Sequence, residues 1–259
     1  MDKNEGKNVG KNGKYLVLDL DQTCIKCFDD FAEKPINREE FESYDKMTQK
    51  ELSKRMRNFT IVDFYPFEDL NGKRNINIGN GSKINITIMK RQYLDEFLDY
   101  CLNNFENLII WSAGKYKYVH LIRDYILPYN SELLVFTYED LINSKNEFSD
   151  EKDLNKVFQQ IPKANYNNTL AIDDTNETFL LNPKNGLWIP PFQATNMLKE
   201  DNAFKTLISF FETEEFKICK DVRTLDYSNI YDSIPENLRD NYEDFLYLHS
   251  DKFTPNTEP

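Results

Sequence analysis

The chain has 259 residues, of which 40% are hydrophobic and 14% are aromatic. This composition is sufficient to bury a core, so a wholly disordered chain is excluded. The net charge of −12 argues against direct binding to nucleic acid or to an anionic membrane surface. No stretch approaches the roughly 20 consecutive apolar residues that a membrane-spanning helix needs. We therefore expect a globular protein that binds neither nucleic acid nor membrane.

The cysteines and the first residues indicate the cellular compartment. The four cysteines do not form the dense framework of small secreted domains, which favours a reducing, intracellular compartment, nuclear or cytoplasmic. Residues 1–13 are polar and lack the apolar segment of a secretory signal, so we expect a flexible leader. Cys24 and Cys27 form a lone C-x-x-C, which leaves a thioredoxin-type pair open, whereas a zinc site would need two further ligands.

Short apolar segments alternate with amphipathic segments along the rest of the chain. The pattern predicts strands at 15–20, 108–111, 133–137 and 170–172, and helices around 94–102, 119–126 and 204–211. Alternation of strand and helix is typical of an α/β protein with a mainly parallel sheet and helices on both faces.

One long segment, residues 28–88, departs from this alternation. Thr48 to Glu51 matches a capping box, so we expect a helix to begin there. Isoleucines then alternate with polar residues on both sides of Asn80-Gly81, a dipeptide typical of two-residue hairpin turns. We interpret 28–88 as an insertion with a small antiparallel sheet inside a main domain of residues 14–215. Residues 216–259 are predicted to form an acidic, helical C-terminal extension.

Polar residues that could take part in a reaction follow the predicted strands or lie just beyond them. Since open α/β sheets bind ligands at the carboxyl ends of their strands, we expect these residues to lie close together. They are Asp19, Asp21 and Thr23 after the first strand, Ser112 after the second, Lys152 after the third, and Asp173 and Asp174 after the fourth.

Together these residues indicate phosphoryl transfer. Asp19 would attack phosphorus and form an aspartyl-phosphate. Asp21, two residues on, would protonate the leaving alcohol and then deprotonate the attacking water. An anionic carboxylate can attack an anionic phosphate ester only when charge is neutralised, and Mg²⁺ held by carboxylates does this. Asp173 and Asp174 would complete that metal site.

The phosphate itself needs partners of its own. Ser112 and Lys152 would hold its oxygens, and the ammonium charge of Lys152 matches the negative charge that spreads over them in the transition state. A lone serine is usually a turn residue or a helix cap, so only the position of Ser112 after the second strand supports this role.

Longer stretches resemble one family. Met89 to Leu98, Trp111-Ser112-Ala113-Gly114 and Lys152-Asp153-Leu154 resemble motifs of the FCP/SCP-like (NLI-interacting-factor-like) phosphatases of the RNA polymerase II C-terminal domain, in the haloacid dehalogenase (HAD) superfamily. So do 182–186 and 189–192, and the resemblance runs from Lys14 to Phe211. It implies a HAD-like Rossmannoid fold and Mg²⁺-dependent hydrolysis of phosphoserine or phosphothreonine in proteins, with the polymerase tail as a candidate partner.

The resemblance also implies individual roles. Mg²⁺ would be held by the Asp19 side chain, the Asp21 backbone carbonyl and Asp174, with Asp173 in support. Thr23 and Ser112 would lie in the active-site loops as phosphate-binding residues, and Lys152 would orient the phosphate. Gln92 stands where the family usually has proline, and residues 137–141 replace its usual arginine and cysteine, which leaves the substrate peptide open.

Other functions stay open at this point. The same chemistry could serve a small molecule or a nucleic-acid end, although the acidic composition disfavours the latter. A catalytically silent binding protein with this fold is a further alternative, but inactive relatives generally lose one of the key carboxylates, which are all present here. Lys90 and Arg91 either contact substrate or are simply solvated, and Trp188 is interpreted as a packing residue.

Overall fold

The computed structural model describes residues 11–29, 36–62, 67–68, 74–75, 83–142, 148–193 and 198–254. Most of the predicted leader and the predicted turn at Asn80-Gly81 lie outside these residues. The strands are β1 (Tyr15–Leu18), β2 (Ile25–Asp29), β3 (Met56–Val62), β4 (Phe67–Glu68), β5 (Arg74–Asn75), β6 (Lys83–Lys90), β7 (Asn107–Trp111), β8 (Val135–Phe136), β9 (Thr169–Asp173) and β10 (Gly186–Trp188). The α-helices are α1 (Arg38–Ser43), α2 (Lys46–Arg55), α3 (Leu94–Asn104), α4 (Tyr116–Ile126), α5 (Asn155–Gln160), α6 (Ala203–Phe211), α7 (Glu214–Ile218) and α8 (Arg239–His249).

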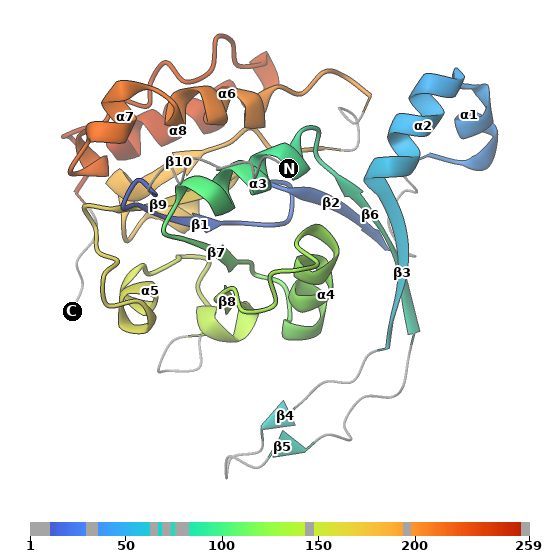
Figure 1. Ribbon diagram of the computed structural model, residues 1–259, viewed down its shortest axis with the longest axis horizontal. Helices are drawn as coiled ribbons and strands as arrows, with labels where there is room; N and C mark the ends of the chain where they lie inside the picture. The colour runs from blue at the N-terminus through green and yellow to red at the C-terminus, as the bar shows by residue number, and fades with distance from the viewer. Residues whose placement is uncertain are drawn as a thin grey trace, which may run out of the picture.

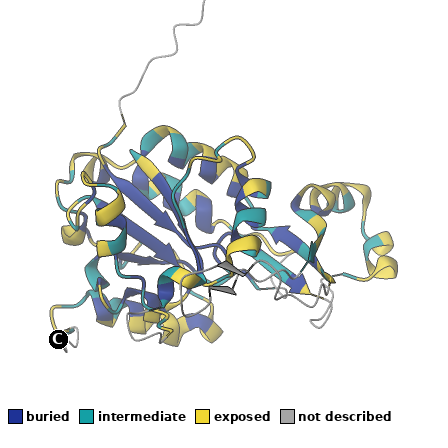
Figure 2. Ribbon diagram, turned by 90° about the horizontal axis from the view of Figure 1, so that it is seen from below, coloured by how far each residue is buried: buried dark blue, intermediate teal, exposed yellow. Residues whose placement is uncertain are grey.

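A five-stranded parallel sheet forms the centre of the molecule, in the order β10-β9-β1-β7-β8. Figure 1 shows helices packed around this sheet. Because both faces are covered, every residue of β1 and β9 is buried, as the dark blue strands of Figure 2 show. The predicted α/β class and parallel sheet are confirmed. The strand predicted at 133–137 is shorter than expected, since only Val135 and Phe136 pair with β7.

A smaller antiparallel sheet has the order β2-β6-β3, and Figure 1 shows it extending to one side of the core. β6 pairs with β2 through Ile25↔Lys90 and with β3 through Met56↔Met89. The antiparallel sheet expected from the alternating isoleucines is therefore present. Its first strand, β2, follows the turn after β1 and contains Cys27.

The N-cap predicted at Thr48 is wrong by three residues. Helix α2 begins at Lys46, and its N-cap is Asp45, whose carboxylate accepts hydrogen bonds from the backbone N–H groups of Met47 and Thr48. An aspartate at this position satisfies two of the free N–H groups of the first turn, so it outcompetes the serine- or threonine-type cap expected from the box.

Aromatic side chains join the helices on one side of the parallel sheet. Phe97 of α3 stacks on Phe204 of α6 with ring centroids 4.4 Å apart, and Phe105 meets Phe211 edge-on at 5.2 Å. Phe97, Phe204 and Phe211 lie on the apolar faces predicted for these helices, whereas Phe105 directly follows α3. Within the part of the chain that the structure describes, no helix combines the length and apolar character needed to span a bilayer.

Candidate active site

Three strand ends meet at one edge of the parallel sheet. β1 lies between β7 and β9, with Leu18 opposite Ile110 on one side and Ile172 on the other. Asp19 directly follows β1, Ser112 directly follows β7, and Asp173 is the last residue of β9. Strand order and register therefore place the nucleophile candidate between the other two predicted site segments.

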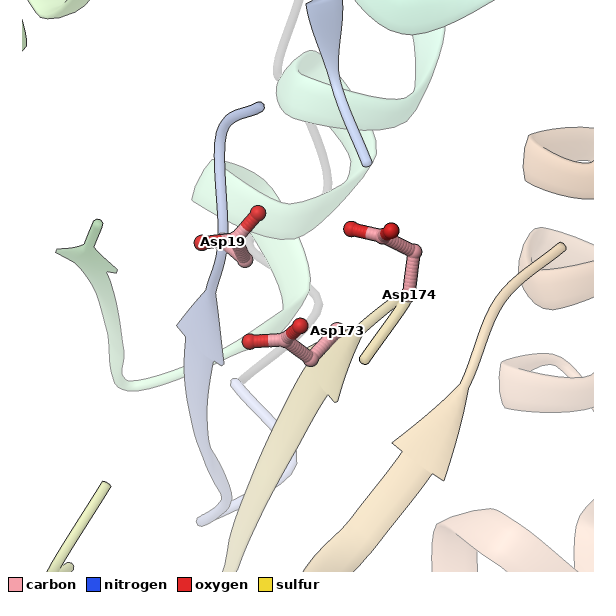
Figure 3. A group of neighbouring side chains, drawn as sticks. All are labelled: Asp19, Asp173 and Asp174. Carbon is pink, nitrogen blue, oxygen red and sulfur yellow. The ribbon is translucent and has the colours of Figure 1, made fainter. Parts of the chain in front are cut away.

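The acidic residues at this edge form a compact group. Oxygen atoms of Asp19, Asp173 and Asp174 all lie within 4.8 Å of one another, and all three residues are buried. Figure 3 shows their carboxylates converging from the ends of β1 and β9. Such a group of carboxylates is the donor set that hard cations such as Mg²⁺ prefer. Three of the four predicted metal-site residues thus contribute side chains to one cluster, while the side chain of Asp21 lies outside it.

Lys152 is the cation of this cluster. Its ammonium group donates to Asp19 at 2.8 Å, to Asp173 at 2.5 Å and to the carbonyl of Trp111 at 2.8 Å. An ammonium group has three N–H donors, so all of them are engaged. The structure therefore places Lys152 in the predicted site, in contact with the nucleophile candidate itself.

The charges of the cluster do not balance. Burial raises the pKa of Asp19, and the neighbouring carboxylates of Asp173 and Asp174 raise it further. Burial and then Asp173 raise the pKa of Asp174 to about 7. Burial alone would lower the pKa of Lys152, but Asp173 and Asp19 outweigh it and raise that pKa. One ammonium thus faces three desolvated carboxylates, and a divalent cation among them would remove the excess negative charge.

The turn after β1 is fixed by several hydrogen bonds. Gln22 has φ of 60°, a left-handed conformation that costs a non-glycine residue about 1 kcal/mol or more. Its carbonyl accepts from the N–H of Phe192 at 2.6 Å. The next residue, Thr23, donates its hydroxyl to Asp174 at 3.1 Å. Thr23, predicted to contact phosphate, therefore contacts a metal-ligand candidate; its phosphate contact stays a prediction.

Asp21 projects to a different partner. Tyr118 of α4 donates to the Asp21 carboxylate at 2.5 Å, and Ser112 lies within 3.5 Å of its other oxygen. Burial raises the pKa of Asp21, while the two hydroxyl donors oppose that rise. Gly114 allows this approach, because a Cβ atom there would lie 2.6 Å from the Tyr118 ring. Sequence reasoning missed Tyr118; the glycine in Trp111-Ser112-Ala113-Gly114 was the available signal.

Two buried residues support the site from behind. The Trp188 indole donates to the backbone carbonyl of Asp174 at 2.9 Å, so this residue, interpreted as packing, also fixes a site segment. Arg91 is buried and forms an ion pair with Asp201 at 2.8 Å, and it donates to the Thr23 carbonyl at 3.2 Å. Neither of the two interpretations of Arg91, substrate contact or solvation, fits this position. Lys90 instead pairs with Asp95 at 2.7 Å.

A cavity of about 350 Å³ opens onto the cluster. Among the described residues that line it, Lys152 is the only lysine or arginine, whereas the carboxylates of Asp19, Asp21, Asp150, Asp173 and Asp174 all belong to the lining. A phosphate ester entering this cavity therefore meets net negative charge unless a cation accompanies it.

The chain is similar in sequence to known proteins. The chain is similar to the "Ubiquitin-like domain-containing CTD phosphatase 1" of Drosophila melanogaster, with 26% identity over 54% of this chain and 46% of that protein. The same-named protein of Xenopus tropicalis is 28% identical over 43% of this chain and 37% of its own length. The chain thus spans less than half the length of these relatives.

Solved structures of Fcp1, an RNA polymerase II CTD phosphatase, also resemble the chain. The fission yeast enzyme bound to beryllium fluoride has a TM-score of 0.49 and 18% identity, over 92% of this chain and 63% of that one. A second Fcp1 structure gives 0.49 and 16%, over 92% and 62%. The NLI interacting factor-like phosphatase family matches residues 14–223. The chain therefore belongs to the NLI interacting factor-like (FCP/SCP-like) phosphatase family.

Proposed function

We propose that this chain is a Mg²⁺-dependent phosphatase that hydrolyses phosphoserine or phosphothreonine in proteins through an aspartyl-phosphate at Asp19. The observation that carries the proposal is the buried cluster of Asp19, Asp173 and Asp174 around Lys152. The family of the chain and the CTD phosphatases among its relatives support a phosphorylated protein as substrate, with the tail of RNA polymerase II as the first candidate.

The first half of the reaction begins at the Asp19 carboxylate. One of its oxygens attacks phosphorus, the bond between phosphorus and the serine or threonine oxygen breaks, and Asp21 gives its proton to the leaving oxygen. Burial raises the pKa of Asp21, which favours the protonated form that a proton donor requires. Tyr118 and Ser112 hold its carboxyl group in position for this transfer.

The second half releases phosphate. Water attacks phosphorus, the bond between Asp19 and phosphorus breaks, and Asp21 takes the proton of that water, which restores both residues. Lys152 and Ser112 hold the phosphate oxygens during these steps. Mg²⁺ would be held by the Asp19 side chain, the Asp21 backbone carbonyl and Asp174, with Asp173 in support, and would neutralise negative charge on the phosphate.

The assay uses an aryl phosphate and a set of phosphoserine and phosphothreonine peptides, with Mg²⁺ present or removed by a chelator. Asp19→Asn keeps the size of the side chain but removes the nucleophile, so we expect turnover to fall by at least about 10³-fold. Asp99→Asn, on the outward part of α3, is the matched control and should keep wild-type activity. Comparable activity of Asp19→Asn and wild type would contradict the mechanism, and a preference for sugar phosphates over every phosphopeptide would contradict the substrate.

A further inference from the structure

The residues beyond the family-matched region, 224–254, pack against the turns that follow Asp174. Two short 3₁₀ segments, Asn176–Phe179 and Pro183–Asn185, lie between β9 and β10, and helix α8 contacts both of them. The family match ends at residue 223, so α8 lies outside the matched residues. Its position raises the question of what those turns hold.

The stretch between β9 and β10 fixes the backbone of Lys152 from two sides. The Lys152 N–H donates to the carbonyl of Thr178 at 3.1 Å, and the Asn182 side chain donates to the Lys152 carbonyl at 2.7 Å. The same stretch begins directly after Asp174. The position of the cation of the cluster and that of one carboxylate therefore depend on the same turns.

Helix α8 holds these turns through a polar and an apolar contact. The Asn176 side chain donates to the backbone carbonyl of Asn241 at 2.6 Å. Phe245 is buried and meets Phe179 edge-on, with ring centroids 6.4 Å apart. At the end of the helix, the His249 imidazole hydrogen-bonds the carbonyl of Gly186, the first residue of β10, at 2.8 Å.

A second line of contacts reaches Asp174 from the loop before α8. The Tyr231 hydroxyl donates to the Trp188 carbonyl at 3.2 Å, and its ring meets the indole edge-on at 6.3 Å. The same indole donates to the Asp174 carbonyl. Two parts of residues 224–254 are thus connected to the cluster. Helix α8 contacts it through the turns between β9 and β10, and Tyr231 contacts it through Trp188.

We propose that residues 224–254 form a brace that holds Asp174 and Lys152 in the geometry needed for cation binding, with Phe245 and Tyr231 as positioning residues. Three buried carboxylates within 4.8 Å repel one another, so their backbone has to be held rigidly if all are to face one ion. Loosening the brace lets Asp174 relax away from Asp19, and the site loses affinity for the ion. The proposal rests on the metal site of the proposed function.

The test measures binding of Mn²⁺ alone by electron paramagnetic resonance, without substrate, on the full chain. Phe245→Leu loosens the contact with Phe179 while keeping an apolar side chain in place. Phe216→Leu is the matched control, because Phe216 is equally buried but packs on Phe105 and Phe211 away from the site. All proteins are compared well below their unfolding temperatures, so that loss of stability alone does not change the measured affinity.

We expect Phe245→Leu to weaken Mn²⁺ binding roughly threefold to tenfold and Phe216→Leu to leave it unchanged. Wild-type Mn²⁺ affinity in both variants, or the same loss of affinity in both, would overturn the brace. Wild-type protein that binds no Mn²⁺ would instead remove the metal site of the proposed function. If Phe245→Leu does not fold, Tyr231→Phe is compared with Tyr242→Phe, whose hydroxyl bonds Ser228 within the same segment; weaker binding in the former alone supports the brace, and equal binding overturns it.

Discussion

The parallel and the antiparallel sheet differ in what their side chains face. β1 and β9 are buried throughout, whereas β3 has no fully buried residue. On the antiparallel sheet, polar side chains pair across strands at the surface, as Thr60 does with Asn85 and Thr87 with Asn58. In the parallel sheet the charged groups are desolvated at the strand ends. The comparison teaches that removing a charged group changes the free energy of unfolding strongly at the ends of the parallel strands and weakly on the antiparallel sheet.

The largest test of this comparison replaces a lysine at each sheet. Lys152→Met leaves Asp19 and Asp173 without their cation, and we expect it to lower the free energy of unfolding by about 3 kcal/mol and turnover by about 10³-fold. Lys90→Met at the end of β6 removes a pair with the exposed Asp95 and should cost less than about 1 kcal/mol. Urea unfolding and the aryl phosphate assay measure both; similar costs for the two variants would break the comparison.

The second test measures how the free energy of unfolding depends on pH through His249, which contacts the edge strand β10 of the parallel sheet. Burial lowers the pKa of His249 to about 4, against about 6.5 in the unfolded chain. Above pH 6.5 both states hold the neutral ring. Between pH 6.5 and 4 the unfolded chain takes up a proton that the folded protein does not, so the free energy of unfolding falls as pH falls, by about 3 kcal/mol across this window.

Urea unfolding at pH 7.5 and pH 5 checks this dependence. His249→Gln keeps a donor for the Gly186 carbonyl but cannot titrate, so the difference between the two pH values should shrink. His120→Gln, on the outer part of α4, should keep the full difference. An unchanged difference in His249→Gln would show that other groups cause the acid sensitivity.

The smallest expected effect is on proton transfer. Tyr118→Phe removes a hydrogen-bond donor to Asp21, and we expect kcat to fall roughly tenfold. Because that hydrogen bond lowers the pKa of Asp21, its loss raises the pKa and moves the alkaline limit of kcat/KM to higher pH. Tyr116→Phe, an exposed tyrosine on the same helix, is the control. A lower kcat with an unmoved pH profile would indicate a packing role for Tyr118.

Local patterns were sufficient to predict the strand ends. Tyr15–Leu18 is an apolar run followed by Asp19, and Thr169–Asp173 ends in an acid; a parallel sheet brings such ends to one edge whatever the loops between them do. That is why the three clustered aspartates and Ser112 could be placed in one site from the sequence, whereas Lys152 was placed there by the resemblance of Lys152-Asp153-Leu154 to a family motif.

The partners of these residues could not be predicted in the same way. Arg91 and Asp201 are 110 positions apart, and Tyr118 and Asp21 are 97 apart, so no local period connects them. Each contact depends on the packing of complete helices against the sheet. The brace by residues 224–254 was missed for the same reason, since the acidic, helical character predicted for residues 216–259 says nothing about which turn a helix there covers.

The saturated ammonium of Lys152 has a consequence for how substrate enters. All three of its donors are occupied by Asp19, Asp173 and the Trp111 carbonyl, so an incoming phosphate oxygen has to replace one of them. In the proposed mechanism, capture of substrate is then an exchange of hydrogen bonds at the Lys152 ammonium. Replacement of the bond to Asp19 would free the proposed nucleophile in the same step that binds the ester.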